Sequence, residues 1–527
     1  MKFRISFPIA VVSVMLGLAI HPASAQLTES TLKGSVVDPT GSVVQHASVL
    51  ATDESTGISR AATSGSDGSF TITNLAPGTY SVQVKTQGYK TFEQTHLQLN
   101  VGTTTQVNAR LEVGQVQETV EVMADQSQVA VSKDGRLSDT LHEAQITQLP
   151  LPVRDVFFLP SLNAGATNIP GQNMSYKLTN SPTVTVNGNR FRGNNYVLDG
   201  SMNTHTLNAG EPGIVPSIES IEEVQVQTGN FSSEYGRGNG SVVNMRTRSG
   251  TNEFHGKAWE YLKNTDLNAR NYFATQRTPQ VFNQFGARIG GPINKNKTFF
   301  FGSYEGTRNA LAQALSFQVE TPEFANYVET TAPQGIAAGL LKNFPAAKPA
   351  PGGGTKYLNE TDITTPLGTV IPGTGTAYEM LHDYLRYDQY LVRIDHTFHG
   401  GNDTLTGRWI NEFDRSLGAT NSLNSNLGVS MRGFLDPYNG AFGNLNLGEI
   451  HVFHGNVNDA RLSFQDDIIS YARPDAQYPA ISITGISAQF GDPASLGSRI
   501  RTYEYRDSLS SVVGRHLLRY GGEFRNI

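Results

Sequence analysis

Residues 240–256 read GSVVNMRTRSGTNEFHG, and they join two different strand patterns. The run before Asn252 closes a unit that begins near Gln115, whereas Phe254–Tyr261 opens a series of strands in which apolar and polar residues alternate. Such alternation predicts strands with one face toward an apolar medium and one toward a polar medium. The same pattern recurs at Gln284–Gly290, Lys297–Tyr304, Tyr390–Phe398, Asp403–Phe413, Phe442–Phe453, Asp459–Gln465, Arg501–Leu509 and Gly514–Phe524.

The connections between these strands differ in length. Asn294–Lys297 and Gly400–Asp403 are short turns, while Arg308–Glu379 is a long insertion rich in proline and glycine. Short turns on one side and long loops on the other are typical of outer-membrane barrels. The 53 glycines, 20 tyrosines and 26 phenylalanines fit such a barrel, but they also fit a secreted soluble protein with an aromatic core. The domain order in front of the strands is needed to decide.

Residues 27–113 contain short strand-like runs separated by turn sequences, which predicts a small β-sandwich. The runs are Leu32–Val37, Ala47–Thr52, Ser69–Thr73, Gly78–Lys85 and Val107–Val113. This unit resembles the carboxypeptidase regulatory-like (transthyretin-like) domain, a non-catalytic sandwich despite its name. The resemblance rests on four motifs in order, namely Gly34–Asp38 with Gly41, Ser66–Phe70, Leu75–Tyr80 and Gly88–Tyr89.

The next unit, from Gln115 to Gly250, changes in character. A weak helical pattern over Leu141–Leu149 ends at Pro150. The unit resembles the plug of a TonB-dependent receptor, a small α/β domain lodged inside a barrel. The motifs are a strand ending in Leu198-Asp199-Gly200, the strand Ile218–Val226, the turn Asn230–Gly236 and a strand closing on Ser249-Gly250-Thr251. The barrel start at Asn252–Gly256, Gly290–Ile293 and Lys297–Gly306 is similar to the first hairpin of Oar-like receptors, which carry the regulatory-like domain before the plug.

Glu118, Thr119, Val120, Glu121 and Val122 lie where such receptors carry the TonB box. The resemblance implies that this segment pairs as a strand with a TonB-type energy-coupling protein, and strand addition is an established mode of peptide recognition. The alternative interpretation is a final strand or linker of the sandwich, and the residues do not decide between the two.

The first 25 residues predict a cleaved export signal. Lys2 and Arg4 precede the apolar run Phe7–Ile20, and Ala23-Ser24-Ala25 places the cut before Gln26. The run is shorter than the ~20 residues that a membrane-spanning helix needs, which argues against an anchor. Together with the resemblance, the signal predicts the outer membrane of a Gram-negative-type bacterium, with outer-membrane lipid as a neighbour.

Composition narrows the remaining classes. Without the signal the chain has 38 Lys and Arg against 46 Asp and Glu, a net charge of −8, and no basic block, so nucleic acid is not an expected partner. Cysteine is absent, which excludes disulfides and thiolate zinc sites. After the signal, no apolar run in the sequence is long enough for a spanning helix.

A search for catalytic motifs finds none. His142-Glu143 begins like a zinc-protease motif, but position 146 is isoleucine rather than the second histidine. Gly236–Gly240 is glycine-rich, but it lacks the lysine and spacing of a phosphate-binding loop. We therefore expect no catalytic residues, no metal and no cofactor, and the protein is not expected to be an enzyme.

These observations predict a mainly β chain: signal peptide 1–25, regulatory-like sandwich 26–114, α/β plug 115–250 and partial transmembrane antiparallel barrel 251–527. Family barrels have 22 strands, and fewer are found here, so we expect the chain to be truncated. The expected function is TonB-dependent uptake of a large scarce substrate such as an iron chelate, cobalamin, a carbohydrate or a peptide. The alternatives are an adhesive, structural or protein-export role, and a secreted hydrolase. The ligand-binding residues are unknown, although Arg308–Glu379 and the residues around Asn203–Glu211 are plausible exterior contacts.

Overall fold

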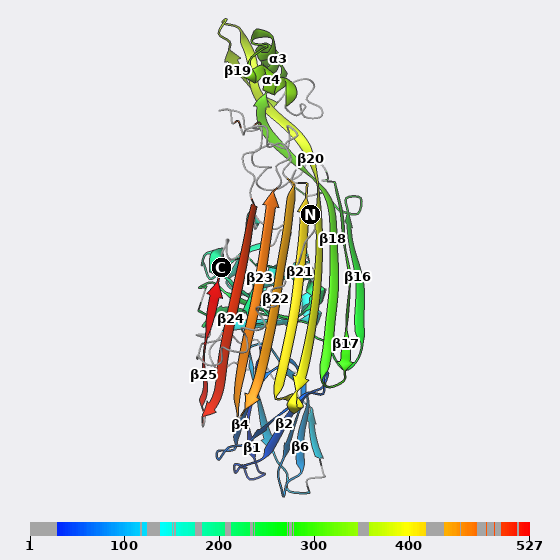
Figure 1. The fold of residues 1–527 in the computed structure, drawn as a ribbon, viewed down its shortest axis with the longest axis vertical. Coiled ribbons are helices and arrows are strands. Elements are labelled where there is room, and N and C mark those ends of the chain that lie inside the picture. Colours follow the sequence, from blue (N-terminus) through cyan, green and yellow to red (C-terminus); the bar gives the residue numbers. More distant parts are fainter. Residues whose placement is uncertain are drawn as a thin grey trace, which may run out of the picture.

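The computed structural model describes residues 29–115, 119–123, 137–149, 151, 154–173, 182–205, 212–231, 235–236, 238–270, 272, 277, 279–345, 358–417, 437–453, 455–471, 481, 490, 497–513 and 516–527. The predicted export signal and Glu118 lie outside these residues. The described chain is mainly β, as predicted, and Figure 1 shows a small blue unit below a tall curved sheet.

The N-terminal unit is a sandwich of two sheets. One sheet has the order β4-β1-β7 and the other the order β3-β2-β5-β6-β8. Alternate side chains such as Leu32, Val49 and Val82 point between the sheets and are fully buried. The strands are β1 (Ser30–Val37), β2 (Ser48–Asp53), β3 (Ser59–Thr63), β4 (Ser69–Leu75), β5 (Gly78–Lys85), β6 (Thr91–Leu99), β7 (Thr104–Arg110) and β8 (Thr119–Met123).

The second unit, residues 137–250, is here called the inner domain. Its main sheet has the order β13-β12-β15-β14-β9, in which only β12 and β15 run parallel. Apolar side chains of this sheet, with Phe157 packed edge-on against Tyr196 at a ring distance of 4.9 Å, form its core. The strands are β9 (Leu137–His142), β10 (Ala166–Asn173), β11 (Pro182–Val186), β12 (Asn195–Leu198), β13 (Ser201–Met202), β14 (Ile221–Gly229) and β15 (Val242–Thr247).

The predicted helix of this domain is shorter than its sequence pattern suggested. Helix α2 spans only Glu143–Gln148, because Leu141 and His142 extend β9 and pair with Val224 and Glu223 of β14. The other helical segments among its described residues are short 3-10 helices at Val156–Leu162, Phe191–Gly193 and Ile218–Ser220. The described part of the inner domain therefore contains more sheet than the expected α/β description implies.

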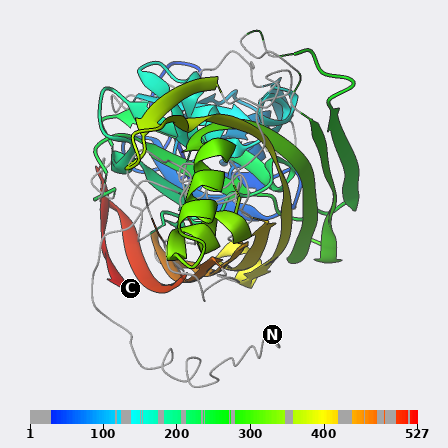
Figure 2. The same ribbon diagram turned by 90° about the horizontal axis from the view of Figure 1, so that it is seen from above.

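The third unit is one large antiparallel sheet, here called the barrel sheet. Its order is β16-β17-β18-β20-β21-β22-β23-β24-β25, and no pairing joins β16 to β25 within the described residues, so the sheet stays open. Figure 2 shows that it curves around the inner domain. The strands are β16 (His255–Asn264), β17 (Gln280–Asn294), β18 (Thr298–Glu320), β20 (Val370–Phe398), β21 (Asp403–Ser416), β22 (Tyr438–Phe453), β23 (Asn456–Tyr471), β24 (Gly497–Val513) and β25 (His516–Asn526).

The predicted long insertion is partly regular structure, which corrects the expectation of a Pro/Gly-rich loop. β18 and β20 stay paired from Thr298↔His396 to Glu320↔Thr374 and form an arm that projects beyond the other strands. The arm carries α3 (Pro322–Thr331), α4 (Ile336–Asn343) and β19 (Leu358–Thr364), which pairs with β20. The prediction failed because proline and glycine were taken as turn signals, although Pro372 and Gly373 sit within the strand ladder.

The two faces of the barrel sheet differ in polarity. On β20, Gln389, Leu391 and Arg393 point toward the inner domain and are buried, whereas Tyr390, Val392 and Ile394 point outward and remain 41–48% exposed. Polar side chains inside and apolar side chains outside are what a membrane barrel requires. No helix among the described residues has the length and apolarity to cross a membrane.

The sandwich is docked on both other units. The Val101 N–H donates to Glu223 Oε1 at 2.9 Å, and the Val101 carbonyl accepts from Gln225 Nε2 at 2.6 Å, both on β14 of the inner domain. Asn252, three residues before the barrel sheet begins at His255, donates its N–H to the Ser55 carbonyl at 3.0 Å. These contacts fix the sandwich at the end of the barrel sheet where the turns are short.

Candidate functional site

A cluster of buried polar contacts surrounds the turn between β12 and β13. Val197 pairs with Met202 and Leu198 with Ser201, so Asp199 and Gly200 form a two-residue hairpin loop. Both have positive φ, 49° and 76°, which is the geometry of a type I′ turn and explains the Asp-Gly sequence. The turn pushes one carboxylate and two carbonyl groups toward the barrel sheet.

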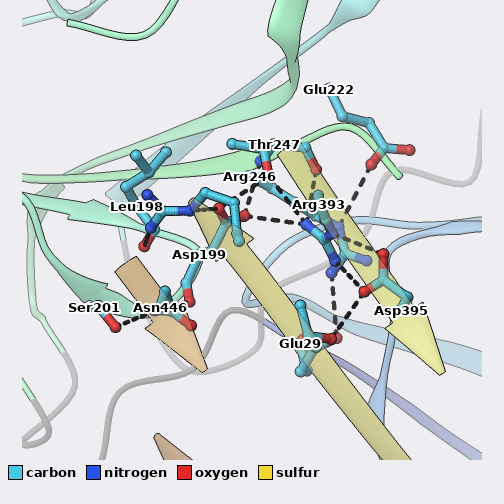
Figure 3. A network of polar contacts seen from close by, with 12 residues as sticks. Glu29, Leu198, Asp199, Ser201, Glu222, Arg246, Thr247, Arg393, Asp395 and Asn446 are labelled. Carbon is cyan, nitrogen blue, oxygen red and sulfur yellow. Dashed lines mark hydrogen bonds and ion pairs between the residues drawn. The ribbon is translucent and has the colours of Figure 1, made fainter. Parts of the chain in front are cut away.

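Four arginines of the barrel sheet close around this turn. Arg393 of β20 and Arg408 of β21 contact the Asp199 carboxylate at 3.3 and 3.0 Å. Arg461 of β23 donates to the Asp199 carbonyl, and Arg506 of β24 donates to the Gly200 carbonyl. We call these four residues with Asp199 and Gly200 the arginine clasp, part of which is shown in Figure 3.

The clasp is almost completely buried from solvent, because Arg408 and Arg506 are at most 1% exposed and Asp199 is 5% exposed. Burial by itself would raise the pKa of Asp199, but Arg393 and Arg408, with hydrogen bonds from Thr247, outweigh it and hold that pKa below its ordinary value. Asp199 is therefore charged at neutral pH.

Further carboxylates balance the excess of positive charge. Arg393 is paired with Asp395 at 2.9 Å and Arg461 with Asp459 at 2.8 Å. Glu29, at the start of the sandwich, lies 3.4 Å from Arg246 of the inner domain and 3.5 Å from Arg461 of the barrel sheet. One network thus joins all three units (Figure 3).

A second set of contacts holds the inner domain nearer the arm. Here barrel carboxylates and amides bind the segment Ile214–Ser217. Glu412 accepts from the Val215 N–H at 3.2 Å, Gln389 accepts from the Ser217 N–H at 2.7 Å, and Glu305 accepts from the Ser217 hydroxyl at 2.7 Å. An apolar cluster beside these contacts includes Ile214, Phe301, Leu391, Ile410 and Phe442.

A third contact involves Glu219, whose side chain is fully buried. Its carboxylate pairs with Lys257 of β16 at 2.8 Å and with Arg154 of the inner domain at 2.9 Å. Removing one partner of a buried ion pair is strongly destabilising, and Glu219 is the fully buried member of both pairs. The contact therefore helps to hold the inner domain against β16.

This site contains no recognisable catalytic arrangement. Within the described ranges, no cluster of three or more histidine, aspartate or glutamate side chains has the geometry of a metal site. The chemistry available is charge pairing and hydrogen bonding between two parts of one chain.

The predicted coupling segment lies on the sandwich. Thr119–Met123 forms β8, which runs parallel to β6 with Phe92 opposite Val120 and Gln94 opposite Val122. β8 is the last strand in its sheet, so its other edge faces no strand in the described part of the chain. The interpretation as a sandwich strand thus describes the observed backbone, while pairing with a coupling protein stays a prediction.

One predicted exterior contact is wrong. Asn203 is fully buried, with its side chain bonded to both the N–H and the carbonyl of Ile214. Residues 206–211 of the same segment lie outside the described ranges. The arginine clasp was not predicted, although Arg393, Arg408 and Arg461 occupy the polar positions of alternating strands, a signal that could have indicated inward-facing charge.

The fold and site define a class of protein. A domain held by a polar network against the concave face of an antiparallel sheet, whose convex face is apolar, defines an outer-membrane barrel protein with an internal domain. The chain belongs to the outer membrane beta barrel domain family, which matches residues 246–527. The carboxypeptidase regulatory-like domain matches residues 31–112. The family places the chain in the outer membrane of Gram-negative bacteria, as the sequence predicted.

The chain is also a homologue of Oar-like TonB-dependent transporters, which confirms the predicted resemblance. It is 27% identical over 422 residues to the TonB-dependent transporter Oar of Myxococcus xanthus, covering 75% of this chain and 35% of that protein. The chain thus spans about a third of the length of this relative.

Solved structures with a similar arrangement include outer-membrane receptors. A mutant of the ferric enterobactin receptor of Pseudomonas aeruginosa is 12% identical, with a TM-score of 0.48 over 74% of this chain and 48% of that one. A siderophore receptor of Acinetobacter baumannii is 13% identical, with a TM-score of 0.47 over 74% of this chain and 47% of that one. The chain spans about half the length of these receptors.

Proposed function

We propose that the protein is a TonB-dependent transporter that takes up a large scarce substrate across the outer membrane. In this proposal the inner domain is a plug that blocks the lumen, and the arm and long loops face outward while the sandwich faces the periplasm. The observation that carries it is the arginine clasp. The barrel holds the plug by ion pairs and hydrogen bonds, which a pulling force can break and which can form again afterwards. Transport of this kind requires no catalytic residue.

The proposed coupling segment is Glu118–Val122. Its support is the position of β8 at a sheet edge, where an added strand finds unpaired backbone groups. The signal at residues 1–25 would export the protein, and 124–136 would connect the coupling segment to β9 of the plug. A force applied to β8 would act first on the hydrogen bonds between β8 and β6. It would then act on the chain that leads to β9, which pairs with β14 of the plug.

Proline at both Val120 and Val122 tests this coupling. Proline removes two backbone N–H donors and distorts the strand, so uptake should fall to the level of a strain lacking the energy-coupling protein. The matched control is Val120→Ala with Val122→Ala, which keeps both N–H groups and should retain most uptake. The full-length protein would be tested for growth of a deletion strain on limiting iron, cobalamin or glycans, which also identifies the substrate. Normal growth of the proline variant would contradict coupling at this segment.

A further inference from the structure

Three arginines stand side by side on the outward face of the barrel sheet. Arg308 of β18 pairs in register with Arg386 of β20, and Arg386 pairs in register with Arg415 of β21. Residues directly opposite on antiparallel strands have Cβ atoms roughly 4.5–5.5 Å apart, and like charges there destabilise a sheet. We call these residues the outer arginine ladder. An anion between the side chains would relieve the repulsion among their positive charges.

The alternation of β20 shows where the ladder points. Arg386 has the same parity as Tyr390, Val392 and Ile394, the outward residues of this strand, and it is exposed. Arg415 is likewise exposed and has the parity of Phe413, which is 37% exposed. The ladder therefore faces away from the inner domain, on the side of the lipid.

The ladder lies at the edge of the apolar band and not within it. On β20 the outward band runs from Phe398 to Tyr390, about 27 Å along the strand and roughly 20 Å after a tilt of about 40°, close to the ~25 Å of membrane barrels. Arg386 follows four residues beyond Tyr390, toward the arm. At this level a membrane presents its headgroups.

The charges of the ladder are only partly balanced within the protein. Arg308 is tied to Asp388 at 2.7 Å and donates to the Tyr387 carbonyl at 2.9 Å. Arg386 contacts the ring of Tyr384 at 5.2 Å, and Arg415 has no hydrogen bond or ion pair to any residue the structure describes. Two of the three guanidinium groups thus keep their donors available.

Two other outward arginines near the same end share a carboxylate. Arg499 and Arg501 of β24 share Asp466, at 2.5 and 3.7 Å. This pair thus has one carboxylate for two arginines, whereas the ladder has one, Asp388, for three. The excess of positive charge is larger at the ladder.

We propose that the outer arginine ladder binds the phosphate group of an anionic glycolipid headgroup in the outer leaflet. Guanidinium groups bind phosphate through two parallel hydrogen bonds, and a phosphate between Arg386 and Arg415 replaces their repulsion with attraction. Arg308, positioned by Asp388, provides a third donor beside them. The outward band below the ladder, with Tyr390 and Phe413 at its edge, would contact the acyl chains of the same lipid. This inference rests on the outward orientation of the arm in the proposed function.

The test measures lipid binding to the full-length protein in detergent by native mass spectrometry. The probes are bisphosphorylated lipid A, the same lipid after removal of its phosphates, and inorganic phosphate as a competitor. Arg386→Gln with Arg415→Gln should weaken binding of the bisphosphorylated lipid by roughly thirty-fold, since each basic residue near a membrane surface contributes about a factor of five. Arg499→Gln with Arg501→Gln removes the same formal charge at the same end and should change binding less than three-fold.

Several outcomes would overturn the proposal. They are equal binding of the dephosphorylated lipid, full displacement of the lipid by millimolar inorganic phosphate, unchanged binding by the double glutamine variant, and an equal loss in the Arg499 and Arg501 control. If the glutamine variant does not assemble, Arg386→Lys with Arg415→Lys keeps the charge. This variant should bind the lipid several-fold more weakly, because lysine cannot form the paired hydrogen bonds. Unchanged binding by the lysine variant would also refute the proposal. The Val120 and Val122 proline variant should bind lipid normally, which separates this test from failure of the proposed transport.

Discussion

Replacing Asp199 by asparagine tests whether charge holds the inner domain in the barrel sheet. Asparagine matches aspartate in shape, tolerates the positive φ of 49°, and still accepts the Thr247 N–H bond of 2.9 Å. What it removes is the negative charge between Arg393 and Arg408, both buried. The turn should survive while the clasp loses its central anion.

The expected loss follows from the burial of the pair. Removing one partner of a buried ion pair costs roughly 3–5 kcal/mol, and the lower end applies here because Asp395 still neutralises Arg393 and the hydrogen bonds persist. A loss of about 3 kcal/mol in the free energy of local opening corresponds to roughly a 150-fold loss of protection. Hydrogen exchange of the β12 and β15 amides, read by mass spectrometry at neutral pH, measures it.

The matched control is Asp67→Asn, the same change before a glycine at a turn of the sandwich, where the carboxylate accepts from the Ser69 N–H and the Ser69 hydroxyl. It should change protection of the inner domain by less than about 0.5 kcal/mol. Because the pKa of Asp199 is held below its ordinary value, its contribution is complete above the unfolded pKa and disappears as pH falls through the lower folded value. Unchanged β12 and β15 protection in Asp199→Asn would show that hydrogen bonds alone hold the turn and would refute the charge argument.

Two further predictions concern neighbouring contacts. Gly200→Ala should lower the stability of the same region by about 1–2 kcal/mol, because φ is +76° and the new Cβ would lie 2.5 Å from Arg461 Nη1; exchange protection equal to the wild type would contradict this. Burial raises the pKa of Glu223 to about 8 from 4.5. The stability contributed by its proton is therefore complete below pH 4.5 and disappears as pH rises to 8. The free energy of unfolding should fall by roughly 4 kcal/mol over this range. Glu223→Gln should remove this dependence, and urea unfolding at pH 5 and pH 8.5 measures it; an unchanged slope in the variant would show that another group titrates.

The sequence predicted the sandwich well where its strands bury apolar residues at every second position. Ser69–Thr73 and Gly78–Lys85 were predicted as strands and lie in β4 and β5. β3, with the sequence SRAAT, was missed because it has no large apolar residue and none of its residues is buried. An edge strand of this kind is held by its partner's backbone, which leaves little trace in composition.

The strands of the barrel sheet were placed more reliably than their ends. Asp459–Gln465 was predicted, but β23 extends over Asn456–Tyr471, because hydrogen bonding to β22 and β24 continues beyond the region where alternation is clear. The arm shows the same effect, since β20 continues through Pro372 and Gly373 and pairs there with β19, where Asp362 lies opposite Pro372. Ladder hydrogen bonds are contributed by the backbone, and every residue type other than proline can both donate and accept them.

The sequence by itself predicted a β-rich outer-membrane protein that resembles Oar-like receptors, because strand alternation and ordered motifs depend only on neighbours along the chain. Only the tertiary structure decided what Leu198-Asp199-Gly200 contacts, since the four arginines of the clasp come from strands about 200 to 300 residues away. The outer arginine ladder is likewise a product of register, because Arg308, Arg386 and Arg415 become neighbours only when three strands pair. Charges that are distant in sequence interact only after strand pairing brings them together, because electrostatic energy depends on distance in space.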